Sequence, residues 1–244
     1  MQEITLALVA AAPFVSAACA IAGWRTAGAW LGEEEGAPPV PPSVPEPEKP
    51  TPDNPTWMWL LTFVATGVLA WIFALAFLSS VKLAAAGVML LALMFAAAVD
   101  ARAKLLPDWP AIVVGLAGGG LAFLRSGWEG LGLALLGGAL AGAGLFVLGR
   151  LVAMRAGREA LGLGDVKYAA AGGLLLGPTL IWTALSAAAA ATLGFVLLGA
   201  LARQSRIERL QEIPFGPALL GAIWLTWMID QATRALPGAW WPGL

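Results

Sequence analysis

Long apolar runs follow one another through most of the chain, and they constrain the fold more than any other feature. The first run covers residues 4–24, and a close succession begins at residue 57. Runs of about 20 apolar residues match a bilayer core of about 30 Å. Hydrophobic residues make up 59% of the 244 residues and charged residues only 12%, so a water-soluble domain of this size could not bury its apolar surface. We expect an all-α, polytopic membrane protein built as a helical bundle.

The positions of the runs predict eight transmembrane spans and three regions. The spans are expected at residues 4–24 and at about 57–79, 82–99, 109–124, 131–153, 166–177, 179–202 and 215–236. The 166–177 run is short for a crossing, and Pro178 separates it from the next run. Residues 32–56 are acidic and rich in Pro, cannot bury a core, and are expected to be a solvated linker. The regions are a first span (1–31), this linker (32–56) and a membrane-embedded domain (57–244).

The basic residues predict the orientation in the membrane. With eight spans and the N-terminus outside, eleven of the fourteen Lys and Arg residues fall on one side. The positive-inside rule assigns that side to the cytoplasm. We therefore expect a multi-pass protein of the bacterial inner membrane, with the linker in the cytoplasm and both termini outside.

Two residue types that dominate enzyme active sites are almost absent. The chain contains no His and one cysteine, Cys19. This excludes Ser-His and Cys-His triads, HExxH metalloprotease sites and CxxC zinc sites, so acid–base chemistry must depend on carboxylates, Lys or Tyr. No metal or cofactor is expected. No basic tract indicates nucleic-acid binding.

Two aspartates next to apolar runs are the strongest functional candidates. Asp100 ends the 82–99 run, and Asp165 precedes the 166–177 run. Two crossings lie between them, so both carboxylates are expected at the same membrane face. Two acids that meet at one depth cannot both be ionised, so the pair shares one proton. A shared proton of this kind is the requirement of an aspartyl protease. The alternative is that Asp165 is only a helix N-cap after a flexible glycine loop.

Gly162 and Gly164 flank the approach to Asp165. We expect them to permit backbone conformations closed to other residues and to let another backbone, such as an extended substrate, approach the carboxylate. The closely spaced glycines of the apolar runs outside residues 161–177 are interpreted as helix-packing positions.

Three motifs occur in a fixed order. They are "DARAKLLPDW" (100–109), "GLGDVKYAAAGGLLLG" (162–177) and "IPFGPALLGA" (213–222). Together they resemble the motifs of bacterial type IV prepilin peptidases, which belong to the GxGD-type membrane aspartyl proteases. The resemblance covers residues 80–236.

The resemblance implies an activity and a set of site residues. The protein is expected to be a hydrolase that removes the short basic leader from type IV prepilins, or from the pseudopilins of type II secretion, at the cytoplasmic membrane face without a metal. Asp100 and Asp165 would be catalytic, and Gly162, Gly164 and Lys167 would form the active-site loop. The remaining motif residues would be structural: Pro107, Asp108, Pro214, Phe215, Gly216 and Pro217.

Three of the motif positions have more specific expectations. Asp108 occupies a position that holds Asp or Asn in the family and is interpreted as a helix cap or turn former. Lys167 would anchor the loop, tune the aspartate pair or act as a positive-inside anchor. Tyr168 stands where the family usually has an apolar residue, and no role is expected for it.

One departure and three alternatives remain. Many prepilin peptidases also methylate the new pilin N-terminus and carry paired CxxC motifs after the first span, but here that region is the cysteine-free linker. We therefore expect a peptidase without methyltransferase activity. The alternatives are an intramembrane protease of the presenilin or signal-peptide-peptidase type, a proton-coupled transporter or channel, and a nonenzymatic interaction role.

Overall fold

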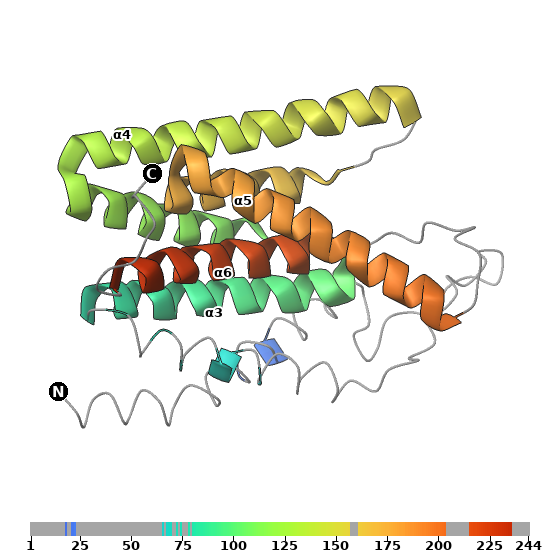
Figure 1. The fold of residues 1–244 in the computed structure, drawn as a ribbon, viewed down its shortest axis with the longest axis horizontal. Coiled ribbons are helices and arrows are strands. Elements are labelled where there is room, and N and C mark those ends of the chain that lie inside the picture. Colours follow the sequence, from blue (N-terminus) through green and yellow to red (C-terminus); the bar gives the residue numbers. More distant parts are fainter. Residues whose placement is uncertain are drawn as a thin grey trace, which may run out of the picture.

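The computed structural model describes residues 80–156, 161–203 and 215–235, together with a few separate positions between residues 18 and 78. Its main elements are four helices, shown in Figure 1: α3 (Ser80–Ala103), α4 (Asp108–Ala156), α5 (Leu163–Arg203) and α6 (Phe215–Ala235). The described residues contain no strand, which confirms the all-α class for this part of the chain.

Three of these helices are long and apolar enough to cross a membrane. The apolar segments are Val81–Asp100, Asp108–Arg155 and Leu163–Leu198, with mean hydropathies of 2.2, 2.2 and 1.9. They support a membrane protein, as the composition predicts. The expected first span, the linker and most of the 57–79 run lie outside the described residues, so the total of eight spans stays a prediction.

A sharp break divides α4 into two arms. At 1.5 Å per residue, 49 helical residues would extend about 73 Å, more than twice the bilayer core. Ser126 and Gly127 leave the helical conformation, and Gly127 has φ 61° and ψ −141°, which only glycine adopts easily. Figure 1 shows the two arms running in opposite directions. They correspond to the predicted runs 109–124 and 131–153.

A second break divides α5 at the predicted position. Gly177 has φ 76° and precedes Pro178, so the helical hydrogen bonding is interrupted there. The arm before the break, from Leu163 to Leu176, is about 21 Å long and therefore shorter than the bilayer core. The second arm runs back across the bundle toward Arg203 (Figure 1).

Glycines allow α4 and α5 to pack with their backbones in contact. A Cβ atom built on Gly173 would lie 2.6 Å from the carbonyl carbon of Gly137. A Cβ on Gly118 would lie 2.6 Å from the Leu175 Cα. Small residues permit such approaches between helices in lipid. The packing interpretation is therefore confirmed for Gly118 and Gly137, and Gly173, inside the 161–177 stretch, packs in the same way.

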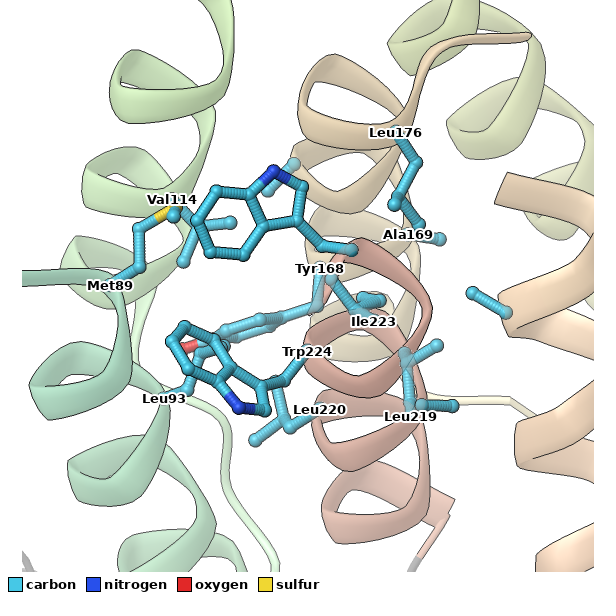
Figure 2. Close-up of a cluster of buried hydrophobic side chains, with 14 of the residues drawn as sticks. Met89, Leu93, Val114, Tyr168, Ala169, Leu176, Leu219, Leu220, Ile223 and Trp224 are labelled. Carbon is cyan, nitrogen blue, oxygen red and sulfur yellow. The ribbon is translucent and has the colours of Figure 1, made fainter. Parts of the chain in front are cut away.

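The core of the bundle lies between α3, α5, α6 and the first arm of α4. Figure 2 shows its centre, where the side chains of Met89, Tyr168, Ile223 and Trp224 gather from three helices. Helices α3 and α6 lie side by side and run in opposite directions (Figure 1), so the beginning of α6 lies beside the end of α3. Asp100 is at that end of α3.

Candidate active site

Asp100 lies near the end of α3 and is 6% exposed, the only buried charged residue in the described part of the chain. Its Oδ2 atom has no hydrogen-bond partner among the described residues. The backbone of Gly216, the second residue of α6, forms a wall of its pocket: a Cβ there would lie 2.8 Å from the Asp100 Cγ. A buried carboxylate oxygen without a partner is costly. It is therefore a candidate for a functional group.

Asp165 lies in the first turn of α5, which begins at Leu163. Its carboxylate is half-buried and accepts a hydrogen bond from the backbone N–H of Gly162. This is one half of a capping box, in which a side chain of the first turn reaches back to the residue before the helix, because Gly162 has no side chain to return a hydrogen bond. The alternative interpretation, in which Asp165 is the N-cap residue, is therefore wrong. Asp165 nevertheless accepts a hydrogen bond from a backbone N–H that the helix leaves free.

The two carboxylates lie close enough to interact electrostatically. They come from α3 and α5, and the two arms of α4 connect them. The structure thus brings together the pair that the chain path and the motifs predict. Lys104 also interacts electrostatically with Asp100, so a positive charge lies near the pair.

Helix α3 ends in an unusual way just after Asp100. Lys104 has φ 55°, a left-handed conformation that usually belongs to Gly or Asn, and its amide donates to the Asp100 carbonyl oxygen at 3.0 Å. This conformation costs a residue with a side chain about 1–2 kcal/mol. The loop that follows carries the Leu-Pro-Asp motif to the start of α4.

Lys167 and Asp108 form an ion pair between the two motifs. The Lys167 Nζ lies 2.6 Å from the Asp108 Oδ1, and both side chains are at least half exposed. Asp108 is the first residue of α4. Of the three interpretations of Lys167, the contact fits the loop anchor, because it ties α5 to the end of the loop.

Tyr168 makes a contact that the sequence analysis did not predict. The side chain is 1% exposed, and its hydroxyl donates to the Pro107 carbonyl oxygen at 2.9 Å. The only signal in the sequence is a single phenol in an otherwise apolar run, since a buried Tyr hydroxyl usually finds a partner. The sequence does not show that this partner lies 61 positions earlier.

The glycines of the loop differ from expectation. Among the described residues only Gly127 and Gly177 are glycines with positive φ, so Gly162 and Gly164 do not supply a special backbone conformation. Gly164 instead makes room for the preceding loop, because a Cβ there would lie 2.8 Å from the Leu106 Cβ. Phe215, Gly216 and Pro217 open α6, whereas Pro214 lies outside the described residues.

The fold and the site define a helical membrane protein with paired carboxylates at one end of its bundle. Residues 87–202 match the model of the type IV leader peptidase family, which supports a protein of the prepilin peptidase type. The match includes Asp100 and Asp165 and confirms the resemblance seen in the first two motifs, whereas the third motif lies beyond it. A match to this family indicates a protease. Searches of curated proteins and of solved structures gave no match.

Proposed function

We propose that the protein is a membrane aspartyl endopeptidase that removes the short basic leader from type IV prepilins or pseudopilins. Asp100 and Asp165 are the catalytic pair. One observation carries this proposal: the only buried charged residue of the described chain has a free carboxylate oxygen and interacts electrostatically with a second acid. Two such acids at one site share a proton.

The shared proton accounts for both halves of peptide hydrolysis. The ionised carboxylate takes a proton from water as the water oxygen bonds to the peptide carbonyl carbon, and the protonated carboxyl donates to the carbonyl oxygen. Collapse of the tetrahedral intermediate breaks the C–N bond, and the leaving amine takes up a proton. The Gly162 N–H holds the Asp165 carboxylate during these steps.

The position of the pair supports cleavage at the membrane surface. Asp100 is the last residue of the apolar segment Val81–Asp100, and Asp165 is near the start of Leu163–Leu198. A substrate with a basic leader next to an apolar helix would place its junction at this level. The basic residues of the sequence favour the cytoplasmic face of the inner membrane. The cysteine-free linker favours a peptidase without methyltransferase activity.

The test is leader cleavage of a type IV prepilin by membranes that contain the wild-type protein or single Asn variants. Asp100→Asn and Asp165→Asn should each lower the cleavage rate at least about 100-fold, because each removes an acid–base group. Asp108→Asn should keep most of the rate, since Asn still accepts a hydrogen bond from Lys167 and an exposed ion pair contributes only about 0–1 kcal/mol.

The outcomes separate the proposal from its alternatives. Equal cleavage by all variants, or none by the wild type on any prepilin or pseudopilin, contradicts the proposal. A cut inside a transmembrane segment, mapped by mass spectrometry, would indicate an intramembrane protease of the signal-peptide-peptidase type instead.

A further inference from the structure

Two consecutive residues of α5 bind the last residue of the loop after α3 and the first residue of α4. Lys167 binds Asp108 at 2.6 Å, and Tyr168 donates to the Pro107 carbonyl at 2.9 Å. The proposed mechanism uses neither bond. The Lys167 bond is largely exposed to solvent, whereas the Tyr168 bond is buried. A buried hydrogen bond in a low-dielectric environment is the stronger constraint on geometry.

We infer that Tyr168 is a positioning residue: by holding the Pro107 carbonyl, its hydroxyl fixes the end of α3 so that the Asp100 carboxylate stays beside Asp165. This inference rests on the proposed function, because the alignment of the two carboxylates matters only if they act as a pair.

Asp100 needs such support from its surroundings. No hydrogen bond from a described residue reaches its Oδ2, so packing and the path of the backbone determine where this atom lies. Four residues later Lys104 adopts a left-handed conformation. Strained backbone of this kind persists only where neighbouring contacts hold it. Pro107 is three residues further along, and its carbonyl is where α5 holds the loop.

Tyr168 is well suited to act as a rigid support. Its ring is part of the buried core and lies among Met89, Leu93 and Ile223 in Figure 2, so the hydroxyl has little freedom to move. The same side chain lies close enough to Asp100 and Asp108 for their charges to act on its hydroxyl group. It therefore lies near both ends of the loop. Without the hydroxyl, the Pro107 carbonyl would lose a buried partner.

The test compares Tyr168→Phe with the wild type in full-length protein in lipid nanodiscs. Removal of the hydroxyl should lower kcat for prepilin cleavage about tenfold and change KM less than twofold, because small misplacements of catalytic groups slow the reaction without weakening binding. Amide hydrogen exchange of a peptide covering residues 101–109 should become severalfold faster. Replacing Tyr168 by 4-aminophenylalanine, which keeps a donor at the same place, should restore most of kcat.

Thr192→Val is the matched control. The Thr192 hydroxyl also donates to a backbone carbonyl from α5, that of Ala188 at 2.8 Å, but in the second arm of the helix. This variant should match the wild type in kcat and in exchange of residues 101–109. If Thr192→Val lowered both as much as Tyr168→Phe does, the effect would be a general loss of helix stability and the inference would be wrong.

Three other results would overturn the inference. One is a Tyr168→Phe variant with kcat within twofold of the wild type. Another is a raised KM at unchanged kcat, which would indicate substrate contact. The third is unchanged exchange of residues 101–109, and this measurement decides the matter even if the wild type cleaves no prepilin. If the wild type cleaves no prepilin, the proposed function fails separately, because there is neither cleavage nor any effect of the Asp variants.

Discussion

Single residues at the end of the bundle determine the shape of the Asp100 pocket, and Gly216 is the most sensitive of them. A Cβ at this position would lie 2.8 Å from the Asp100 Cγ and closer still to its Oδ2. Gly216→Ala should therefore displace the carboxylate or push α6 away. We expect at least a tenfold loss of prepilin cleavage from protein that still folds, measured as initial rates at equal protein amounts.

Gly221→Ala provides the control on the same helix, because nothing lies within 4 Å of a Cβ at that position. It should cleave at the wild-type rate. Equal activity of both alanine variants would show that the pocket can widen and that the wall at Gly216 is not needed.

The sequence predicted the acid pair and missed the tyrosine for a physical reason. The sequence predicts two crossings between Asp100 and Asp165, and an even number of crossings returns the chain to the same face whatever the details of packing. The partner of Tyr168 is a backbone carbonyl on another helix, and its position depends on how the helices pack. Gly162 and Gly164 show the same dependence on packing. The sequence suggested an unusual backbone conformation there, but Gly164 instead makes room for Leu106.

At the scale of elements, the breaks in α4 and α5 could be predicted from the sequence. For the contact between these two helices, the sequence predicted that glycines pack but not which glycines meet. Pro178 and the polar residues near Gly127 mark the ends of apolar runs, so the breaks follow from the sequence. Closely spaced glycines indicate that helices approach one another. Which glycines face each other depends on the rotation of each helix, and only the structure shows that Gly137 meets Gly173.

This contact gives a stability prediction. A Cβ on Gly137 would lie 2.6 Å from the Gly177 carbonyl carbon and 2.8 Å from the Pro178 nitrogen, so neighbouring backbone would have to move. Gly137→Ala should lower the free energy of unfolding by about 1–3 kcal/mol, as overpacking of a core does. Thermal unfolding in nanodiscs, followed by circular dichroism, measures the change.

Gly132→Ala is the comparison for this helix, since nothing lies within 4 Å of its added Cβ. It should leave the melting temperature unchanged or raise it slightly, because Ala favours helix more than Gly does. If Gly137→Ala melted at the same temperature as Gly132→Ala, the backbones would not be in contact there.

At the scale of the whole molecule, α3 and α6 are joined at both ends. One end holds Asp100 against Gly216. At the other, the Lys82 Nζ donates to the Gln231 Oε1 at 2.7 Å. The Gln231 Nε2 and the Arg234 Nε both donate to the Asp230 Oδ2, at 3.1 and 2.8 Å. This polar network lies far from Asp100 and Asp165, and so it should contribute to stability rather than to chemistry.

Lys82→Met tests this division of roles. Loss of a partly buried hydrogen bond to a charged group should reduce stability by about 1.5–3 kcal/mol, whereas cleavage well below the melting temperature should stay within twofold of the wild type. Arg150→Met, an exposed position on α4, should change neither quantity. A large loss of activity in folded Lys82→Met would instead show that the two ends are coupled.

The position of Gly216 in the chain also affects when the proposed active site is complete. Synthesis proceeds from the N-terminus, so α3 is made first, Asp165 follows only after both arms of α4, and the wall formed by α6 comes later still. Until α6 has inserted, Asp100 lacks one side of its pocket. The nascent chain is therefore expected to be inactive. It should not cleave the membrane proteins around it until α6 has inserted.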